Sequence, residues 1–206
     1  MHAPLGLRGT GVACERNERW LFKDIDFSLE PGQALQVTGP NGCGKTTLLR
    51  MICGLLPLHY GQLYWDTQLI EKAHSEFYKH LYYLGHKKAI KLALSPLENL
   101  QLSLMSVEHR HILMALATVG LADYAATPCW QLSAGQQQRV ALAALSLSKT
   151  KLWILDEPFT ALDQQGIAHF EACFEQHVQQ GGMLMLTTHH SFTLPTVRVH
   201  SLSLAV

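Results

Sequence analysis

The chain has 206 residues, 48% of them hydrophobic, and its 16 Lys and Arg side chains equal its 16 Asp and Glu side chains in number. This composition allows one packed domain and excludes a disordered chain. The balanced charge argues against bulk electrostatic binding of nucleic acid, so we expect no nucleic-acid partner. An obvious basic cluster consists of His86, Lys87, Lys88 and Lys91.

Cysteine usage and apolar runs bear on where the chain acts. The five cysteines are odd in number and form no C-x-x-C pair, which fits a reducing compartment better than a disulfide framework or a zinc site. Residues 1–19 hold no apolar segment of a secretory signal, and no apolar run approaches the roughly 18 residues that a membrane span needs. We therefore expect any action on a membrane to go through another chain.

The first half of the chain predicts short strands around one helix. A strand over 20–29 is followed by the turn Pro31-Gly32, and its inward positions are Phe22, Ile25, Phe27 and Leu29. Further strands are predicted over 34–38 and 63–65, and a helix over 45–53 stops at Gly54. Residues 82–84 are a short apolar run closed by Gly85.

The middle of the chain changes to helical patterns. Ser95 and Glu98 form a capping-box helix start, and another helical pattern over 107–119 is ended by Gly120. We therefore expect residues 75–135 to be a mostly helical insertion. After it, a helix from 134, a strand over 152–155, another helix and a strand over 183–187 predict a parallel sheet with crossover helices. The whole chain, 1–206, is predicted to be one domain, with its α/β core in 1–74 and 136–206.

A phosphate-binding loop follows the strand at 34–38. Residues 39–46 fit G-x-x-x-x-G-K-[ST], in which the glycines let several backbone N–H groups face one phosphate chain. Lys45 would reach the β- and γ-phosphates of ATP, the Thr46 hydroxyl would bind Mg²⁺, and Thr47 would support the loop. Cys43 either carries a thiol whose alkylation blocks ATP or only fills a small-residue position. The nucleotide-binding residues predicted here are Gly39, Pro40, Asn41, Gly42, Cys43, Gly44, Lys45, Thr46 and Thr47.

Acidic residues and histidines follow two later strands. The segment KLWILDE at 151–157 predicts a buried strand that delivers two carboxylates at its C-terminal end, where ligands bind in open α/β sheets. Asp156 would hold the Mg²⁺ shell and Glu157 would orient or deprotonate the attacking water; the alternative is that they only cap the next helix. Asp163 is a candidate helix N-cap, which is compatible with a functional role. His189, rather than His190, is the candidate for contact with a γ-phosphate, so the candidate catalytic residues are Lys45, Glu157 and His189.

A second helix start that could bind an anion lies at the segment LSAGQ, residues 132–136. Its residues are Leu132, Ser133, Ala134, Gly135 and Gln136. A serine hydroxyl and free backbone N–H groups stand there at the positive end of a helix dipole, where an anion can bind. One nucleotide does not obviously need two such helix starts.

The order of these motifs resembles that of the ATP-binding subunit of ABC transporters, and the resemblance covers nearly the whole chain. The motifs are the phosphate-binding loop, LSAGQ, the apolar strand with DE, ALD and TH. The resemblance implies a P-loop NTPase fold of the ABC cassette type, with a RecA-like mixed β-sheet core, an antiparallel β subdomain and a helical subdomain that carries LSAGQ at its end. It implies an ATPase that uses ATP and Mg²⁺. It also implies a head-to-tail homodimer, in which Ser133 and Gly135 of one chain close over the nucleotide held by the other.

The sequence departs from this family at two positions. The family usually has a glutamine that contacts Mg²⁺ and couples to the membrane subunit, and His86 stands there instead, or Lys87 if the loop slips by one. An imidazole is a poorer hydrogen-bonding mimic of an amide. The family often stacks an aromatic ring on adenine, and that position falls near Arg16, whose guanidinium plane can also stack. Trp20 lies nearby and is otherwise a core or edge-strand aromatic.

Shorter strings are similar to one branch of the family. The chain is similar in these strings to the ATP-binding subunit of the haem exporter in bacterial cytochrome c maturation. The strings are LYW at 63–65, LGH at 84–86 with a following Ile-Lys at 90–91, ENL at 98–100 and DEPFTALD at 156–163. That branch implies a peripheral protein at the cytoplasmic face of the bacterial inner membrane, bound to a separate transmembrane ABC subunit, with haem-pathway proteins as further partners. ATP would drive either haem export or release of a haem-loaded chaperone. The alternatives are the ATPase of another ABC transporter, a soluble non-transport ABC ATPase, and a nucleotide-gated clamp with little turnover.

Overall fold

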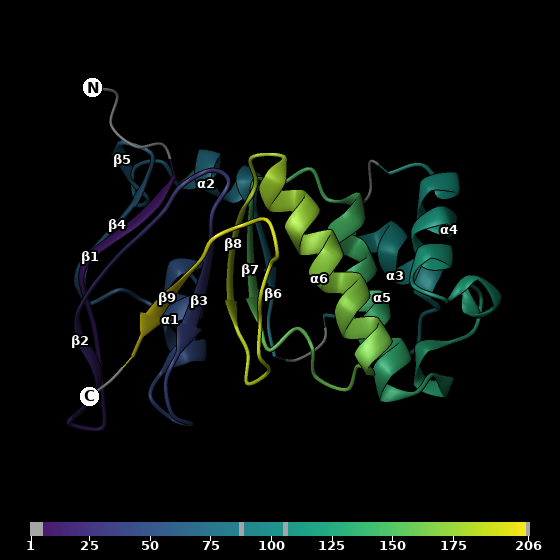
Figure 1. The fold of residues 1–206 in the computed structure, drawn as a ribbon, viewed down its shortest axis with the longest axis horizontal. Helices are drawn as coiled ribbons and strands as arrows, with labels where there is room; N and C mark the ends of the chain where they lie inside the picture. The colour runs from purple at the N-terminus through teal and green to yellow at the C-terminus, as the bar shows by residue number, and fades with distance from the viewer. Residues whose placement is uncertain (1–5, 87–88, 105–106, 205–206) are drawn as a thin grey trace.

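The computed structural model describes residues 6–86, 89–104 and 107–204, and their strands form two sheets (Figure 1). The antiparallel sheet contains β1 (Leu7–Arg16), β2 (Arg19–Leu29), β4 (Tyr60–Trp65) and β5 (Gln68–Leu69), in the order β2-β1-β4-β5. The parallel sheet contains β3 (Ala34–Thr38), β6 (Leu81–Leu84), β7 (Leu152–Asp156), β8 (Met183–Thr187) and β9 (Val199–Ser203), in the order β6-β7-β8-β3-β9. The parallel sheet agrees with the order of elements in the sequence, and the antiparallel sheet is the β subdomain that the family resemblance implies.

Helices cover both faces of the parallel sheet. They are α1 (Lys45–Ile52), α2 (His74–His80), α3 (Pro96–Ser103), α4 (His109–Thr118), α5 (Ala134–Leu147) and α6 (Gln164–Gln179), with 3₁₀ turns at Ala122–Tyr124 and Cys129–Gln131. The capping box predicted for α3 is confirmed, because the backbone N–H of Glu98 donates to Oγ of Ser95 at 3.3 Å and the backbone N–H of Ser95 donates to Oε2 of Glu98 at 2.8 Å. No helix within the described ranges has both the length and the apolar character to cross a membrane.

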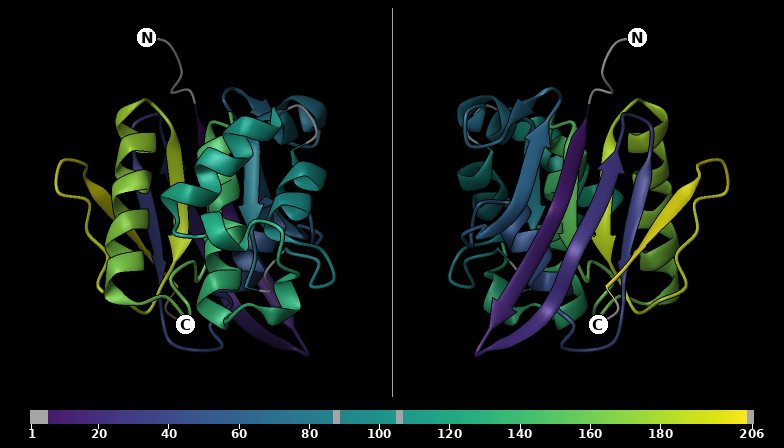
Figure 2. Two further views of the ribbon diagram at one scale, coloured as in Figure 1. Left: turned by 90° about the vertical axis from the view of Figure 1, so that its right-hand side faces the viewer. Right: turned by 90° about the vertical axis from the view of Figure 1, so that its left-hand side faces the viewer.

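The parallel sheet separates two apolar clusters. Successive side chains of a strand point to opposite faces, so β7 and β8 divide their apolar residues between the clusters. Ile154 and Met185 pack with α1 and the antiparallel sheet, whereas Trp153 and Leu184 pack with α5 and α6. Figure 1 shows the resulting order of layers, and the right-hand view of Figure 2 shows the antiparallel sheet from its outer side. Helices α1 and α5 therefore lie on opposite faces of one sheet.

The predicted elements recur in the structure with ends shifted by no more than three residues. The strands at 34–38 and 183–187 have the predicted bounds, and Phe22, Phe27 and Leu29 are buried as expected, while Ile25 is half-buried. The sequence did not predict β1, β5, β9 or α2. In β1, the glycines at 9 and 11 hid the strand pattern, and the pairing with β2 shifts register between Gly9 and Val12.

The extent of the helical insertion differs from the sequence interpretation. We expected residues 75–135 to be mostly helical, yet β6 lies within this range and pairs with β7 at the edge of the parallel sheet. The apolar run at 82–84 belongs to this strand, whose Leu84 is buried in the cluster that contains α5. The helices of the insertion therefore begin only with α3, which is the first helix after β6.

Candidate nucleotide-binding site

The loop between β3 and α1 needs glycine at both ends. Gly39 has φ 142°, and a Cβ there would lie 2.8 Å from the carbonyl oxygen of Leu204. Gly44 has φ 101° at the N-cap of α1, and a Cβ there would lie 2.9 Å from the ring of Phe22. Side chains at these positions would combine backbone strain with steric clashes. The sequence therefore dictates a tight loop that opens a helix, the local geometry that binds phosphate.

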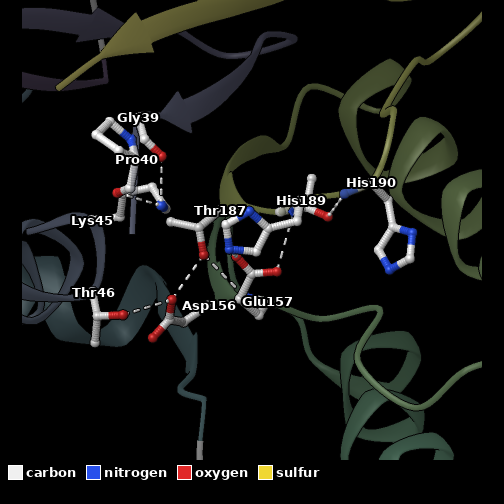
Figure 3. Close-up of polar contacts among 10 residues, drawn as sticks. Gly39, Pro40, Lys45, Thr46, Asp156, Glu157, Thr187, His189 and His190 are labelled. Atoms are coloured by element: carbon white, nitrogen blue, oxygen red, sulfur yellow. Dashed lines mark hydrogen bonds and ion pairs between the residues drawn. The ribbon is translucent and has the colours of Figure 1, made fainter. Parts of the chain in front are cut away.

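The ammonium group of Lys45 is held by the loop itself. Its Nζ donates to the carbonyl oxygens of Gly39 at 2.8 Å and of Pro40 at 3.2 Å, as Figure 3 shows. Both partners are neutral acceptors, so an anionic phosphate oxygen would be the stronger partner for this cation.

Asp156 forms the centre of the polar contacts beside the loop. It ends β7 and is 2% exposed. Its Oδ1 accepts from the hydroxyls of Thr46 at 3.1 Å and Thr187 at 2.8 Å (Figure 3). Its Oδ2 is buried and makes no hydrogen bond within the described part of the chain. A buried carboxylate oxygen without a partner, next to a threonine hydroxyl, fits a hard cation such as Mg²⁺.

Glu157 and His189 lie together, as the sequence order suggested. The backbone N–H of His189 donates to Oε2 of Glu157 at 3.3 Å, and the imidazole Nε2 lies 3.3 Å from Oε1 without hydrogen-bond geometry. Glu157 has φ 54°, a conformation that non-glycine residues adopt only where their surroundings impose it. The ring of His190 points away from Glu157 in Figure 3 and stands edge-on to Phe159.

These groups line one open cavity of about 370 Å³. Its lining residues are Arg16, Leu21, Asn41, Gly42, Gly44, Lys45, Thr46, Thr47, His86, Asp156, Glu157 and His189. The cavity thus brings residues at the carboxyl ends of β3, β6, β7 and β8 together with Arg16 of β1 and Leu21 of β2. This is the edge at which ligands bind in parallel α/β sheets.

Four residues that the sequence left open have different positions. Arg16 and His86 line the cavity, whereas Lys87 is outside the described residues. Trp20 is not among the lining residues and packs on Tyr60 of β4 with ring centroids 5.2 Å apart, as a strand aromatic does. Cys43 is 6% exposed, belongs to the apolar cluster around α1 and is also absent from the lining.

The LSAGQ segment starts α5 with a complete capping box. The backbone N–H of Gln136 donates to Oγ of Ser133 at 3.2 Å, and the backbone N–H of Ser133 donates to Oε1 of Gln136 at 2.9 Å. Leu132 is buried, while Ser133 and Ala134 are exposed. None of residues 132–136 is among the residues described as lining the cavity, and α5 lies on the other face of the sheet from α1. Within one chain, the two helix starts therefore do not face the same ligand site.

Asp163 is confirmed as the N-cap of α6. Its Oδ1 accepts from the backbone N–H of Gly166 at 2.8 Å, and both carboxylate oxygens lie 3.1 Å from the Arg139 guanidinium. The hydrogen bond from Gly166 is the main cause that lowers the pKa of Asp163, and the charge of Arg139 adds to it.

Sequence reasoning missed Thr187 as a site residue. Besides its bond to Asp156, its hydroxyl accepts from the backbone N–H of Glu157 at 3.0 Å, so it fixes both acidic residues. Asp156 and Thr187 are register partners in β7 and β8, and parallel pairing alone places them side by side. The signal in the sequence is the polar residue that ends the apolar strand at 183–187, directly before the two histidines.

The sequence profile of the ABC transporter family matches residues 22–160. The chain belongs to the ABC transporter family. Among curated relatives, two proteins named cytochrome c biogenesis ATP-binding export protein CcmA are similar to it: that of Hahella chejuensis is 46% identical over 191 residues, covering 91% of this chain and 90% of the relative. That of Escherichia coli K12 is 42% identical over 198 residues, covering 96% of each chain.

Solved structures share the fold of this ABC family member at lower identity. A putative ABC transporter ATP-binding protein from Pyrococcus furiosus superposes with a TM-score of 0.80 at 23% identity, covering 95% of this chain and 96% of the other. A dimeric ATP-binding cassette, MJ0796, in a post-hydrolysis state with ADP and Pi, has a TM-score of 0.78 at 22% identity, with 89% and 88% covered. The ABC cassette fold predicted from the motif order is thereby confirmed.

Proposed function

We propose that this chain is the ATP-hydrolysing subunit of a membrane ABC complex that energises export in cytochrome c biogenesis. The observation that carries the proposal is the convergence of Lys45, Thr46, Asp156, Glu157 and His189 on one cavity, in a chain similar over most of its length to cytochrome c biogenesis ATP-binding export proteins. The reaction is hydrolysis of ATP to ADP and phosphate.

ATP binds with its phosphates on the loop at 39–46. Phosphate oxygens replace the two loop carbonyls as acceptors for Lys45, and the backbone N–H groups at the start of α1 face the same phosphates. Arg16 stands at the cavity where it can stack on adenine through its guanidinium plane.

Thr46 and Asp156 are the residues that would hold Mg²⁺. The support is the buried Oδ2 of Asp156 without a partner in the described chain, next to the Thr46 hydroxyl. When bound there, Mg²⁺ neutralises negative charge on the β- and γ-phosphates. His86 lies in the same cavity, where its imidazole can donate to a water molecule in place of the glutamine usual in the family.

Glu157 is the general base. One of its carboxylate oxygens accepts a proton from water while the water oxygen bonds to the γ-phosphorus and the bond to the bridging oxygen breaks. His189 contacts both carboxylate oxygens, and the Glu157 backbone N–H is fixed by Thr187. The carboxylate is therefore oriented before ATP arrives.

The site is completed by a second copy of the chain. Ser133 and Gly135 would close over the nucleotide held by the partner copy, head to tail. The exposed helix start at Ser133, positioned away from this chain's own cavity, supports an action across an interface.

The cargo and the membrane partner follow from the branch that the short strings resemble. We propose that the chain binds a separate transmembrane subunit at the cytoplasmic face of the bacterial inner membrane. ATP turnover there energises haem export or the release of a haem-loaded chaperone, with haem-pathway proteins as further partners.

Co-purification tests this proposal. The tagged full-length chain, solubilised from membranes, should retain a transmembrane subunit, contain haem in the complex and hydrolyse ATP, with Lys45→Ala as the control that assembles without turnover. Recovery of an active chain only from the soluble fraction would contradict it and favour a non-transport ABC ATPase. A haem-free complex with an unrelated transporter subunit would overturn the cytochrome c assignment, and a complex without turnover would favour a nucleotide-gated clamp.

A further inference from the structure

Three contacts join the start of α5 to the segment 157–163, which carries Glu157 and Asp163. The side-chain amide of Gln138 donates to the carbonyl oxygen of Pro158 at 2.8 Å. Gly135 lies so close to this segment that a Cβ on it would be 2.7 Å from the carbonyl oxygen of Ala161. Arg139 pairs with Asp163, with both N–O distances at 3.1 Å.

Of these three contacts, the hydrogen bond from Gln138 to Pro158 is buried. Gln138 is 6% exposed and lies in α5 five positions after Ser133, so its amide is shielded from water. Losing the donor would leave the buried carbonyl of Pro158 without its partner. By comparison, the carboxylate of Asp163 is exposed and its pairing with Arg139 competes with solvent.

Pro158 directly follows Glu157, and the backbone here is constrained. Glu157 has φ 54° and Ala161 has φ 65°, both in the left-handed region. Non-glycine residues stay in that backbone region only where their surroundings hold them. Gln138 is one of the groups that hold the Pro158 peptide. The position of the Glu157 carboxylate therefore depends on where α5 lies.

We infer that Gln138 is a positioning residue that makes Glu157 respond to the nucleotide bound at the other site of the dimer. This rests on the proposed head-to-tail dimer, in which the start of α5 contacts the partner's nucleotide while Glu157 of the same chain acts on its own. When Ser133 and Gly135 engage the partner's ATP, α5 is fixed in place. Through the Gln138 amide, the Pro158 peptide and the Glu157 carboxylate are then fixed as well.

The first test replaces the amide by an apolar side chain of similar length, Gln138→Met. The matched control is Gln179→Met, which removes an amide hydrogen bond to Thr196 at the far end of α6. ATP-dependent dimers are measured by light scattering in the Glu157→Gln background, and turnover is measured with the full-length chain. We expect Gln138→Met to form the dimer, to lose about tenfold or more in kcat with KM almost unchanged, and to lose cooperativity in ATP concentration.

Gln138→Glu gives a readout that a purely structural role would not give. A protonated carboxyl group can donate to the Pro158 carbonyl, whereas a carboxylate cannot, and burial favours the protonated form. We expect kcat of Gln138→Glu to be close to the parent in acid and to fall as the pH rises, a dependence that Gln138→Met lacks. Identical pH profiles of the two variants would overturn the inference.

The outcomes separate this inference from the proposed function. If Glu157→Gln alone forms no ATP-dependent dimer, the proposed function fails, and the inference fails with it. If that dimer forms but Gln138→Met keeps the kcat and cooperativity of the parent, only the inference is wrong. Should Gln138→Met not fold, Gln138→Glu decides, because the inference requires its kcat to fall relative to the parent as the pH rises, and a pH profile identical to that of the parent refutes it.

Discussion

The hydroxyl of Thr46 donates to Oδ1 of Asp156 at 3.1 Å, although the two residues are 110 positions apart in the chain. This bond joins the first turn of α1 to the carboxyl end of β7. It places Oδ2 of Asp156, which makes no hydrogen bond to the described residues, beside the loop that would hold the phosphates. This arrangement supports the proposal that the pair holds a cation.

Asp156→Asn should weaken the dependence of ATP binding on Mg²⁺. The amide can still accept from Thr46 and Thr187, but it removes the negative charge that attracts the ion. We expect ATP affinity without Mg²⁺ to stay near that of the parent, while the gain in affinity on adding Mg²⁺ is lost. Titration of a fluorescent ATP analogue with and without chelator measures both. An unchanged gain with Mg²⁺ would show that Asp156 does not hold the ion.

Glu157→Gln should bind ATP but stall hydrolysis. The amide cannot take the proton of the attacking water, and loss of a general base reduces turnover by about 10²–10⁴-fold. ATP-bound dimers should then accumulate, which size-exclusion chromatography with light scattering detects. Lys45→Ala serves as the control that binds ATP weakly and forms no ATP-dependent dimer. Turnover of Glu157→Gln at the parent rate would remove Glu157 as the base.

Ser133→Arg should separate binding from dimer formation. Ser133 is exposed at the start of α5, and a long cation there blocks a closed interface without reaching this chain's own cavity. Ser133→Ala also loses the hydroxyl and the cap, at a cost of about 1 kcal/mol, but adds no bulk or charge, so it is the control for the steric and charge effect of the arginine. We expect monomer ATP affinity to be retained in both variants and the ATP-dependent dimer to be absent in Ser133→Arg. Loss of ATP binding by the monomer would refute the action across an interface.

Most of the residues predicted from the sequence line one cavity, because their types and order are those that one chemistry requires. A phosphate chain and a cation require particular residue types, which could therefore be recognised in the sequence. They are the glycines at 39 and 44, Lys45 and the two acids after a buried strand. His189 followed from its place after the last predicted strand. Arg16 and His86 were placed by counting from neighbouring motifs, and both line the cavity.

Other features depend on contacts between distant segments and could not be predicted. Thr187 becomes a site residue only through the register of β7 with β8, and Gln138 only through the packing of α5 on the segment after Glu157. The strand β1 was hidden by its glycines and becomes stable between β2 and β4. Helical periodicity around β6 likewise did not reveal that this short run completes the sheet.

Cys43 should react slowly with a bulky thiol reagent in the folded protein. The sequence suggested a thiol at the phosphates, but the side chain is 6% exposed and turned into the apolar cluster around α1. Cys14 and Cys173 are partly exposed and should be modified first. Peptide mapping after timed alkylation, with and without ATP, measures this order. Rapid labelling of Cys43 that ATP prevents would restore the original interpretation.

Acid should destabilise the fold through His177, which stacks on Trp153 with ring centroids 3.7 Å apart and planes 2° apart. Burial lowers the pKa of His177, partly offset by hydrogen bonds with the backbone of Met183 and Lys151. The folded state therefore keeps His177 neutral, while the unfolded chain takes up a proton below about pH 6.5, so stability falls as the pH drops through that value. His177→Phe keeps the stacked ring but cannot titrate. Urea unfolding midpoints between pH 8 and pH 5.5 should decline less for His177→Phe than for the parent, and equal declines would exclude His177 as a source of acid sensitivity.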